Sequence, residues 1–153
     1  MAMTIAEKIL AKKSGRSHVA PGDLVTVETD TVVLFDNNFM PSIWQDVLKM
    51  EHPERVVVII DHRAPAPTIQ SAGAHRTARK LVEKFKLARF HDVGGTQGIC
   101  HQVVADEGYA LPGTVLVCSD SHTCSGGAFN CIARGVGGPD VIYSAVKGET
   151  WFR

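Results

Sequence analysis

The chain has no long apolar run and no excess of either charge. Its longest apolar runs, Val56–Ile60 and Val115–Cys118, have the length of buried strands and fall far short of the ~20 residues that span a membrane. The 16 Lys and Arg residues balance the 16 Asp and Glu residues, so no basic surface is indicated for nucleic acid or a membrane. The N-terminal residues lack an apolar signal segment. We therefore expect a cytoplasmic protein with no nucleic-acid or membrane partner.

Cysteine is scarce, and its spacing disfavours the common cysteine-based metal sites. The four residues, Cys100, Cys118, Cys124 and Cys131, contain no Cys-x-x-Cys pair, so a zinc knuckle or ferredoxin-type loop is not expected. Disulfides are not expected in a reducing compartment. We interpret Cys118 and Cys131 as small buried residues, the latter on a helix, and Cys124 as a loop residue without chemistry.

Strand and helix patterns alternate along the chain. Runs rich in Val, Ile and Thr predict strands over residues 24–35, 56–60, 90–93 and 114–118. Apolar spacing and capping residues predict helices over residues 5–11, 43–48, 68–87, 101–107 and 127–134, and another from Pro139. This alternation predicts one α/β domain over residues 1–153, with a mostly parallel sheet flanked by helices.

Acidic, hydroxyl and imidazole side chains follow, or lie near, the ends of separate predicted strands. Because neighbouring parallel strands bring their carboxyl ends together, we expect these side chains to share one site. They are Asp61, His62, His101, Asp120, Ser121 and His122. The other histidines, His18, His52, His75 and His91, have no comparable context and are interpreted as solvated.

The segment 117–128 is the most informative in the chain. It reads Val-Cys-Ser-Asp-Ser-His-Thr-Cys-Ser-Gly-Gly-Ala, and a Gly-Val-Gly-Gly run follows at 135–138. Asp120 and Ser121 could simply cap the next helix. The added His122 and glycines favour a ligand site, in which backbone N–H groups approach an anion. Tight helix packing is the alternative explanation for the second glycine group.

These motifs resemble the aconitase superfamily, and within it the large subunits of 3-isopropylmalate dehydratase and homoaconitase. The similarity is collinear over nearly the whole chain. The segments that carry it are Met3–Leu10, Ile60–Thr68, Gly98–Gln102, Leu116–Phe129, Ala133–Val141 and Lys147–Phe152. The last of these segments, Lys147–Phe152, resembles a strand found in the archaeal-type branch of the family. The fold implied is that of the first domain of the aconitase family.

The resemblance implies a hydro-lyase, which reversibly removes water from a hydroxy-dicarboxylic acid such as 3-isopropylmalate. His62, paired with Asp61, would protonate the departing hydroxyl group. His101 and His122 would hydrogen-bond the hydroxyl or water, and Asp120 would accept a hydrogen bond from that water. Ser121 would bind a substrate carboxylate.

The resemblance also implies that this chain is incomplete as an enzyme. Family large subunits have roughly 400 residues, more than the single domain expected for 153 residues. Their [4Fe–4S] cluster is held by later cysteines, so no cofactor ligand is expected in this chain. The catalytic base belongs to a small, swivelling subunit. The expected partners are therefore the rest of the large subunit, the small subunit and a dicarboxylate substrate, and the isolated chain should be inactive.

Two other functions remain open at this point. The chain could be a stand-alone domain derived from the family that binds a dicarboxylate or a metal without catalysis. It could also be a metal hydrolase that uses His62, His101, Asp120 and His122 as ligands, residue types that suit zinc or iron. Neither His-x-His nor His-Glu-x-x-His spacing supports the hydrolase.

Overall fold

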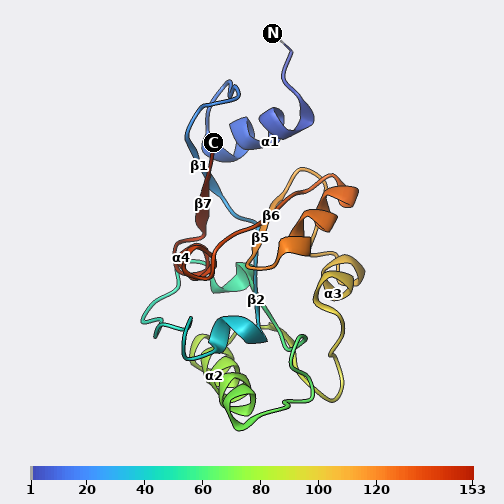
Figure 1. The fold of residues 1–153 in the computed structure, drawn as a ribbon. Helices are drawn as coiled ribbons and strands as arrows, with labels where there is room; N and C mark the ends of the chain where they lie inside the picture. Colours follow the sequence, from blue (N-terminus) through green and yellow to red (C-terminus); the bar gives the residue numbers. More distant parts are fainter. Residues whose placement is uncertain (1) are drawn as a thin grey trace.

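The computed structural model describes residues 2–153 and confirms the predicted α/β fold (Figure 1). Its centre is a five-stranded parallel sheet with the order β4-β3-β2-β5-β6. The strands are β2 (Thr31–Phe35), β3 (Val56–Ile59), β4 (Arg89–His91), β5 (Val115–Cys118) and β6 (Ile132–Gly135). Every residue of β2, β3 and β5 is buried, as expected for apolar strands covered on both faces.

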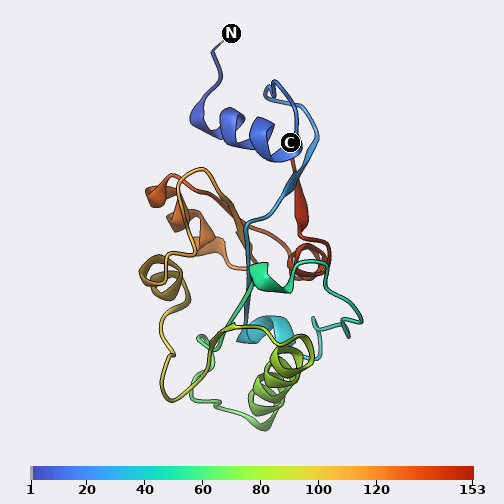
Figure 2. The same ribbon diagram turned by 180° about the vertical axis from the view of Figure 1, so that it is seen from behind.

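Helices cover both faces of this sheet. On one face α2 (Ile69–Phe85) and α4 (Gly138–Lys147) pack against a set of strand side chains that includes Leu34 and Val58. On the other face α3 (Cys100–Asp106) packs against their neighbours along the strands, Phe35 and Val57. The two sets differ because successive strand residues point to opposite faces. Figures 1 and 2 show α4 and α3 on opposite sides of β2.

A separate two-stranded sheet was not predicted. β1 (Val25–Glu28) pairs antiparallel with β7 (Glu149–Phe152), and α1 (Ile5–Ser14) packs against β1. The predicted single strand over residues 24–35 is therefore wrong, since β1 and β2 belong to different sheets. The break lies at Asp30, whose carboxylate accepts the backbone N–H of Val115 at 2.8 Å.

Four of the predicted helices correspond to α1, α2, α3 and α4. Thr4 and Glu7 form a capping box at the start of α1, with Glu7 N–H donating to Thr4 Oγ1 at 3.3 Å. Thr68 caps α2 through the N–H of Ser71. α3 and the start of α4 near Pro139 also agree with the predictions. No helix within residues 2–153 is both long and apolar enough to cross a bilayer.

Two predicted helices are wrong. Residues 45–50 have no regular secondary structure, and Leu48 is 86% exposed although its spacing placed it on an apolar helix face. The predicted helix over 127–134 is divided between the 3₁₀ segment η3 (Ser121–Phe129) and strand β6. Asn130 ends η3 in the left-handed conformation, at φ 57°. β6 then pairs with β5, a long-range interaction that local propensity does not report. Cys131 is buried as predicted, but before a strand rather than on a helix.

Two histidines interpreted as solvated are buried. His75 on α2 is 4% exposed and lies 3.9 Å from a carboxylate oxygen of Asp36. His91 at the end of β4 is 6% exposed, with Nδ1 3.1 Å from the Thr96 carbonyl and Nε2 2.9 Å from the Tyr109 hydroxyl. His18 is exposed and the His52 side chain half-exposed, as expected for loop residues.

Candidate functional site

The carboxyl ends of β2, β3 and β5 meet at one edge of the parallel sheet. β3 and β4 lie on one side of β2, and β5 and β6 lie on the other, so the winding direction reverses between β2 and β5. Open parallel sheets bind ligands outside the strand ends at such a reversal. Asp36 follows β2, Asp61 follows β3 and Ser119 follows β5, which brings the polar residues of three segments together.

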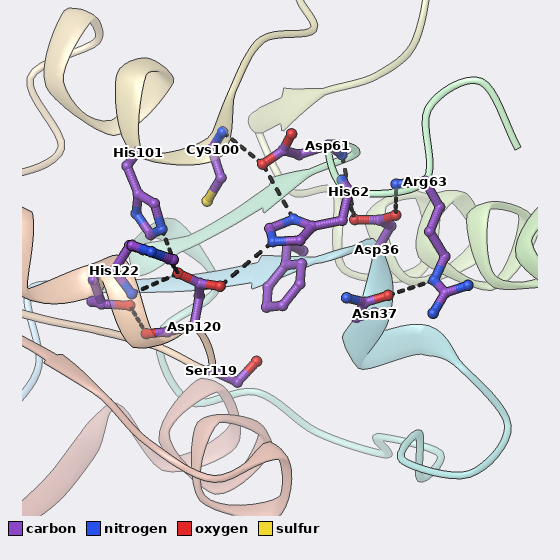
Figure 3. Close-up of polar contacts among 12 residues, drawn as sticks. Asp36, Asn37, Asp61, His62, Arg63, Cys100, His101, Ser119, Asp120 and His122 are labelled. Atoms are coloured by element: carbon purple, nitrogen blue, oxygen red, sulfur yellow. Dashed lines mark hydrogen bonds and ion pairs between the residues drawn. The ribbon is translucent and has the colours of Figure 1, made fainter.

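Asp120 lies at the centre of the predicted residues (Figure 3). Its Oδ1 accepts hydrogen bonds from His101 Nε2 and from the backbone N–H of His122, both at 2.7 Å. The His122 ring lies close as well, with Nδ1 3.2 Å from the same oxygen. The other oxygen, Oδ2, is 3.5 Å from His62 Nε2. One carboxylate therefore joins three of the predicted histidines.

His62 lies between two carboxylates. Its Nδ1 is 3.2 Å from Asp61 Oδ2, and its Nε2 faces Asp120. Asp61 Oδ2 also accepts the backbone N–H of Cys100 at 2.8 Å, which joins the loop after β3 to the start of α3. The Phe35 ring packs against the imidazole, with ring centroids 4.5 Å apart. His62 can therefore carry a proton on either nitrogen with an acceptor opposite each.

Asp120 is held in its charged form. Burial raises the pKa of its carboxyl group, but the hydrogen bonds from His101 and His122 outweigh burial and lower the pKa to about 2. The Asp120 side chain is 14% exposed, whereas that of His122 is 82% exposed. The site therefore has a fixed anionic centre and one histidine that reaches into solvent.

The alternative interpretation of Asp120 as a helix cap is also correct. Asp120 occupies the N-cap of η3 and accepts from the backbone N–H of His122. Ser121 is the exposed first residue of η3 and lies next to this group in the chain. The structure thus brings Asp61, His62, His101, Asp120 and His122 into direct contact, and it places Ser121 beside them.

The sequence did not single out Asp36. This residue comes directly after the predicted strand over residues 24–35, and its carboxylate is fully buried. It accepts the backbone N–H groups of Asp61, His62 and Arg63 at 3.4, 3.0 and 2.7 Å. An acidic residue directly after a buried strand was the available signal, the same one that identified Asp61.

The cysteines of residues 2–153 do not gather into a group of potential metal ligands. Cys100, Cys118 and Cys131 are buried, and Cys124 is exposed. Within residues 2–153, the one group of three potential metal ligands contains no cysteine: it consists of His101, Asp120 and His122, whose ligand atoms lie within 4.8 Å of one another. His62, a required ligand of the metal-hydrolase alternative, is outside that group.

Comparison with known proteins identifies the family of this chain. A model of the aconitase family (aconitate hydratase) matches residues 30–153. The chain belongs to the aconitase family. It is 48% identical over 153 residues to the 3-isopropylmalate dehydratase large subunit of Mycolicibacterium smegmatis, a match covering 100% of this chain and 36% of the relative.

Two further aconitase-family relatives give the same coverage. The homoaconitase large subunit of Thermus thermophilus is 40% identical over 156 residues, which cover 100% of this chain and 36% of the relative. A probable 3-isopropylmalate dehydratase large subunit of Methanothermobacter thermautotrophicus is 38% identical over 160 residues, which cover 100% of this chain and 37% of the relative. The chain therefore spans little more than a third of the length of these relatives.

Proposed function

We propose that this chain is the proton-handling part of a hydro-lyase large subunit that acts on a hydroxy-dicarboxylic acid of the 3-isopropylmalate type. The observation that carries the proposal is the position of His62 between the Asp61 and Asp120 carboxylates. The dehydratase and homoaconitase relatives support the reaction class. The single domain at residues 1–153 would be the N-terminal part of that longer subunit.

His62 is the proposed general acid. Hydroxide is a poor leaving group, so its departure requires a proton donor. Asp61 orients the imidazole by accepting from Nδ1, which leaves the Nε2 proton to move to the departing hydroxyl group. The Asp120 carboxylate, 3.5 Å from Nε2, would help to hold this nitrogen toward the departing hydroxyl group.

The other residues would bind and orient the reacting groups. His101 is fixed by its hydrogen bond to Asp120 and would contact the hydroxyl group or the water formed from it. The exposed His122, whose ring lies 6.2 Å from that of His101, would contact the same group, and Asp120 would accept a hydrogen bond from the water. Ser121, at the start of η3, would bind a substrate carboxylate.

The complete enzyme would need groups from outside this chain. We propose a [4Fe–4S] cluster held by cysteines beyond residue 153, where it would supply a Lewis acid to the hydroxyl group. The small subunit would supply the base, and the assembled enzyme would work in the cytoplasm. On this proposal the isolated chain has no hydro-lyase activity.

A non-catalytic binding domain is the second candidate. The convergence of His101, Asp120 and His122 favours it, because these side chains could bind a divalent cation without any partner. A native stop codon after Arg153, with tight cation binding by the 153-residue protein, would support this candidate over the hydro-lyase.

The decisive experiment begins with the gene sequence past codon 153. The complete large subunit should be purified without oxygen with its small subunit and assayed for dehydration of 3-isopropylmalate and homocitrate. We expect H62N to lower kcat by about 10²–10⁴-fold, the usual contribution of a general acid. H52N is the matched control, because His52 is a loop histidine beside one glutamate, and it should keep full activity. Equal activity of H62N and H52N would contradict the proposed role.

A further inference from the structure

A pocket of about 380 Å³ lies beside the Asp–His group and is not used by the chemistry proposed above. It opens between the carboxyl ends of β2 and β5, where the winding of the sheet reverses. Its polar walls include Asn37, Asn38, Arg63 and Ser119, and its apolar walls include Met40 and Ile43.

Arg63 brings a positive charge to this pocket. Its Nε donates to Asn37 Oδ1 at 2.6 Å, which orients the guanidinium group (Figure 3). Arg55 and Arg79 form ion pairs with carboxylates, but Arg63 forms none within the part of the chain that the structure describes. Its two terminal amino groups are left to bind a ligand. A planar guanidinium group held by one edge fits a carboxylate in a bidentate manner.

Ser119 provides a second donor, and the hydrogen-bond pattern shows why. Asn38 Oδ1 accepts the backbone N–H of Phe35 at 2.9 Å, which fixes the orientation of the amide group. Asn38 Nδ2 must then donate to Ser119 Oγ, at 2.6 Å. A serine hydroxyl that accepts in this way keeps its own hydrogen for another acceptor.

The pocket is also joined to the proposed acid. Arg63 follows His62 in the chain, and the buried Asp36 carboxylate binds the backbone N–H groups of both. Figure 3 shows Arg63 and Asn37 on the side of His62 away from His101 and His122. The imidazole of His62 therefore lies between the Arg63 guanidinium group and the Asp120 carboxylate in this view.

We propose that this pocket is a carboxylate subsite, in which Arg63 binds one carboxylate of a dicarboxylate, Ser119 donates a second hydrogen bond to the ligand, and Met40 and Ile43 contact its alkyl substituent. The subsite rests on the proposed function for the identity of the substrate. The observations favour an alkyl-substituted dicarboxylate over an inorganic anion, because Met40 and Ile43 add apolar side chains to the lining.

Binding of 3-isopropylmalate to the 153-residue chain tests the subsite without the rest of the enzyme. Calorimetry should show that R63Q raises Kd by at least about tenfold, since a bidentate charge-assisted pair is lost. The Kd of R63K should lie between those of the wild type and R63Q, because lysine keeps the charge but lacks the planar guanidinium group. R76Q is the matched control, removing an exposed arginine of α2, and should bind like the wild type. Thermal unfolding of each variant should confirm a folded protein.

Three results would overturn the subsite: no binding by the wild-type chain, equal Kd values for R63Q and R76Q, or phosphate binding as tightly as 3-isopropylmalate. Kinetics of the complete enzyme separate this proposal from the proposed function. There R63Q should raise KM by about tenfold with a smaller change in kcat. A complete protein without dehydratase activity whose binding still depends on Arg63 would refute the function and leave the subsite standing. An active enzyme in which R63Q leaves KM unchanged would support the proposed function and refute the subsite.

Discussion

The buried carboxylate of Asp36 accepts the backbone N–H of His62 at 3.0 Å. The same carboxylate accepts the N–H groups of Asp61 and Arg63, so the end of β2 holds the whole loop that follows β3. The Asp61–His62 pair and the proposed Arg63 subsite therefore depend on one residue that contacts neither reacting group.

Removal of this carboxylate should destabilise the protein strongly. D36A leaves three partly buried backbone N–H groups without their acceptor, and we expect a loss of about 3 kcal/mol in the free energy of unfolding. Urea denaturation measures this value. D23A is the control, because Asp23 accepts one N–H, from Ala20, at an exposed turn, and its loss should stay below about 1 kcal/mol. Similar losses in the two variants would show that the Asp36 carboxylate is not what holds the loop.

Asp120 should titrate well below an ordinary aspartate. The carbon-13 signal of its carboxyl group should have a midpoint at about pH 2, and H101A should raise that midpoint because it removes one of the hydrogen bonds that lower the pKa. A lowered pKa stabilises the fold above the unfolded value of about 3.9, and this stabilisation is lost as the pH falls toward 2. A wild-type midpoint at the ordinary value, or no change in H101A, would refute this account of the Asp120 charge.

Gly135 should be required for the position of Asp120. A Cβ at residue 135 would overlap the Asp120 backbone carbonyl, so G135A must displace the segment that carries Asp120 and His122. We expect shifted NMR signals for the imidazoles of His101 and His122. G95A is the control, since a Cβ there meets nothing within 4 Å and φ is not positive. Unchanged imidazole signals in G135A would argue against this close packing.

Lys86 should be replaceable by glycine with a gain in stability. It ends α2 in the left-handed conformation, at φ 53°, which glycine adopts at no steric cost. We expect K86G to raise the free energy of unfolding by about 0.5–1 kcal/mol. K80G, in the exposed middle of the same helix, should lower it by about 1 kcal/mol. Thermal or urea unfolding of the pair checks the opposite signs, and destabilisation by K86G would contradict the conformational argument.

The candidate site was predictable because its residues follow strands with strong local signals. Val56–Ile60 and Val115–Cys118 are continuous apolar runs, so the acidic and histidine residues directly after them could be assigned to one edge of a sheet. Asp36 follows a similar run but was missed, because its role depends on backbone groups 25–27 residues away. The Asn38–Ser119 hydrogen bond spans 81 residues and has no local pattern.

The errors in secondary structure have the same origin. The segment 127–134 has helical apolar spacing, but pairing with β5 turns its second half into β6. Residues 24–35 are mostly β-prone, yet pairing with β7 takes the first part into a different sheet. Local propensity is a weak prior that such contacts override.

The sequence by itself determined the α/β class, the cap of α1, the position of α2, the membership of the aconitase family and five of the residues that meet at the site. These depend on periodicity, capping and motif order, which are read from near neighbours in the chain. Only the tertiary structure decided the strand order, the burial of His75 and His91, and the role of Asp36 as the acceptor for the His62 loop. These depend on which distant segments exclude water from one another, and hydrogen bonds between such segments are set by packing rather than by local sequence.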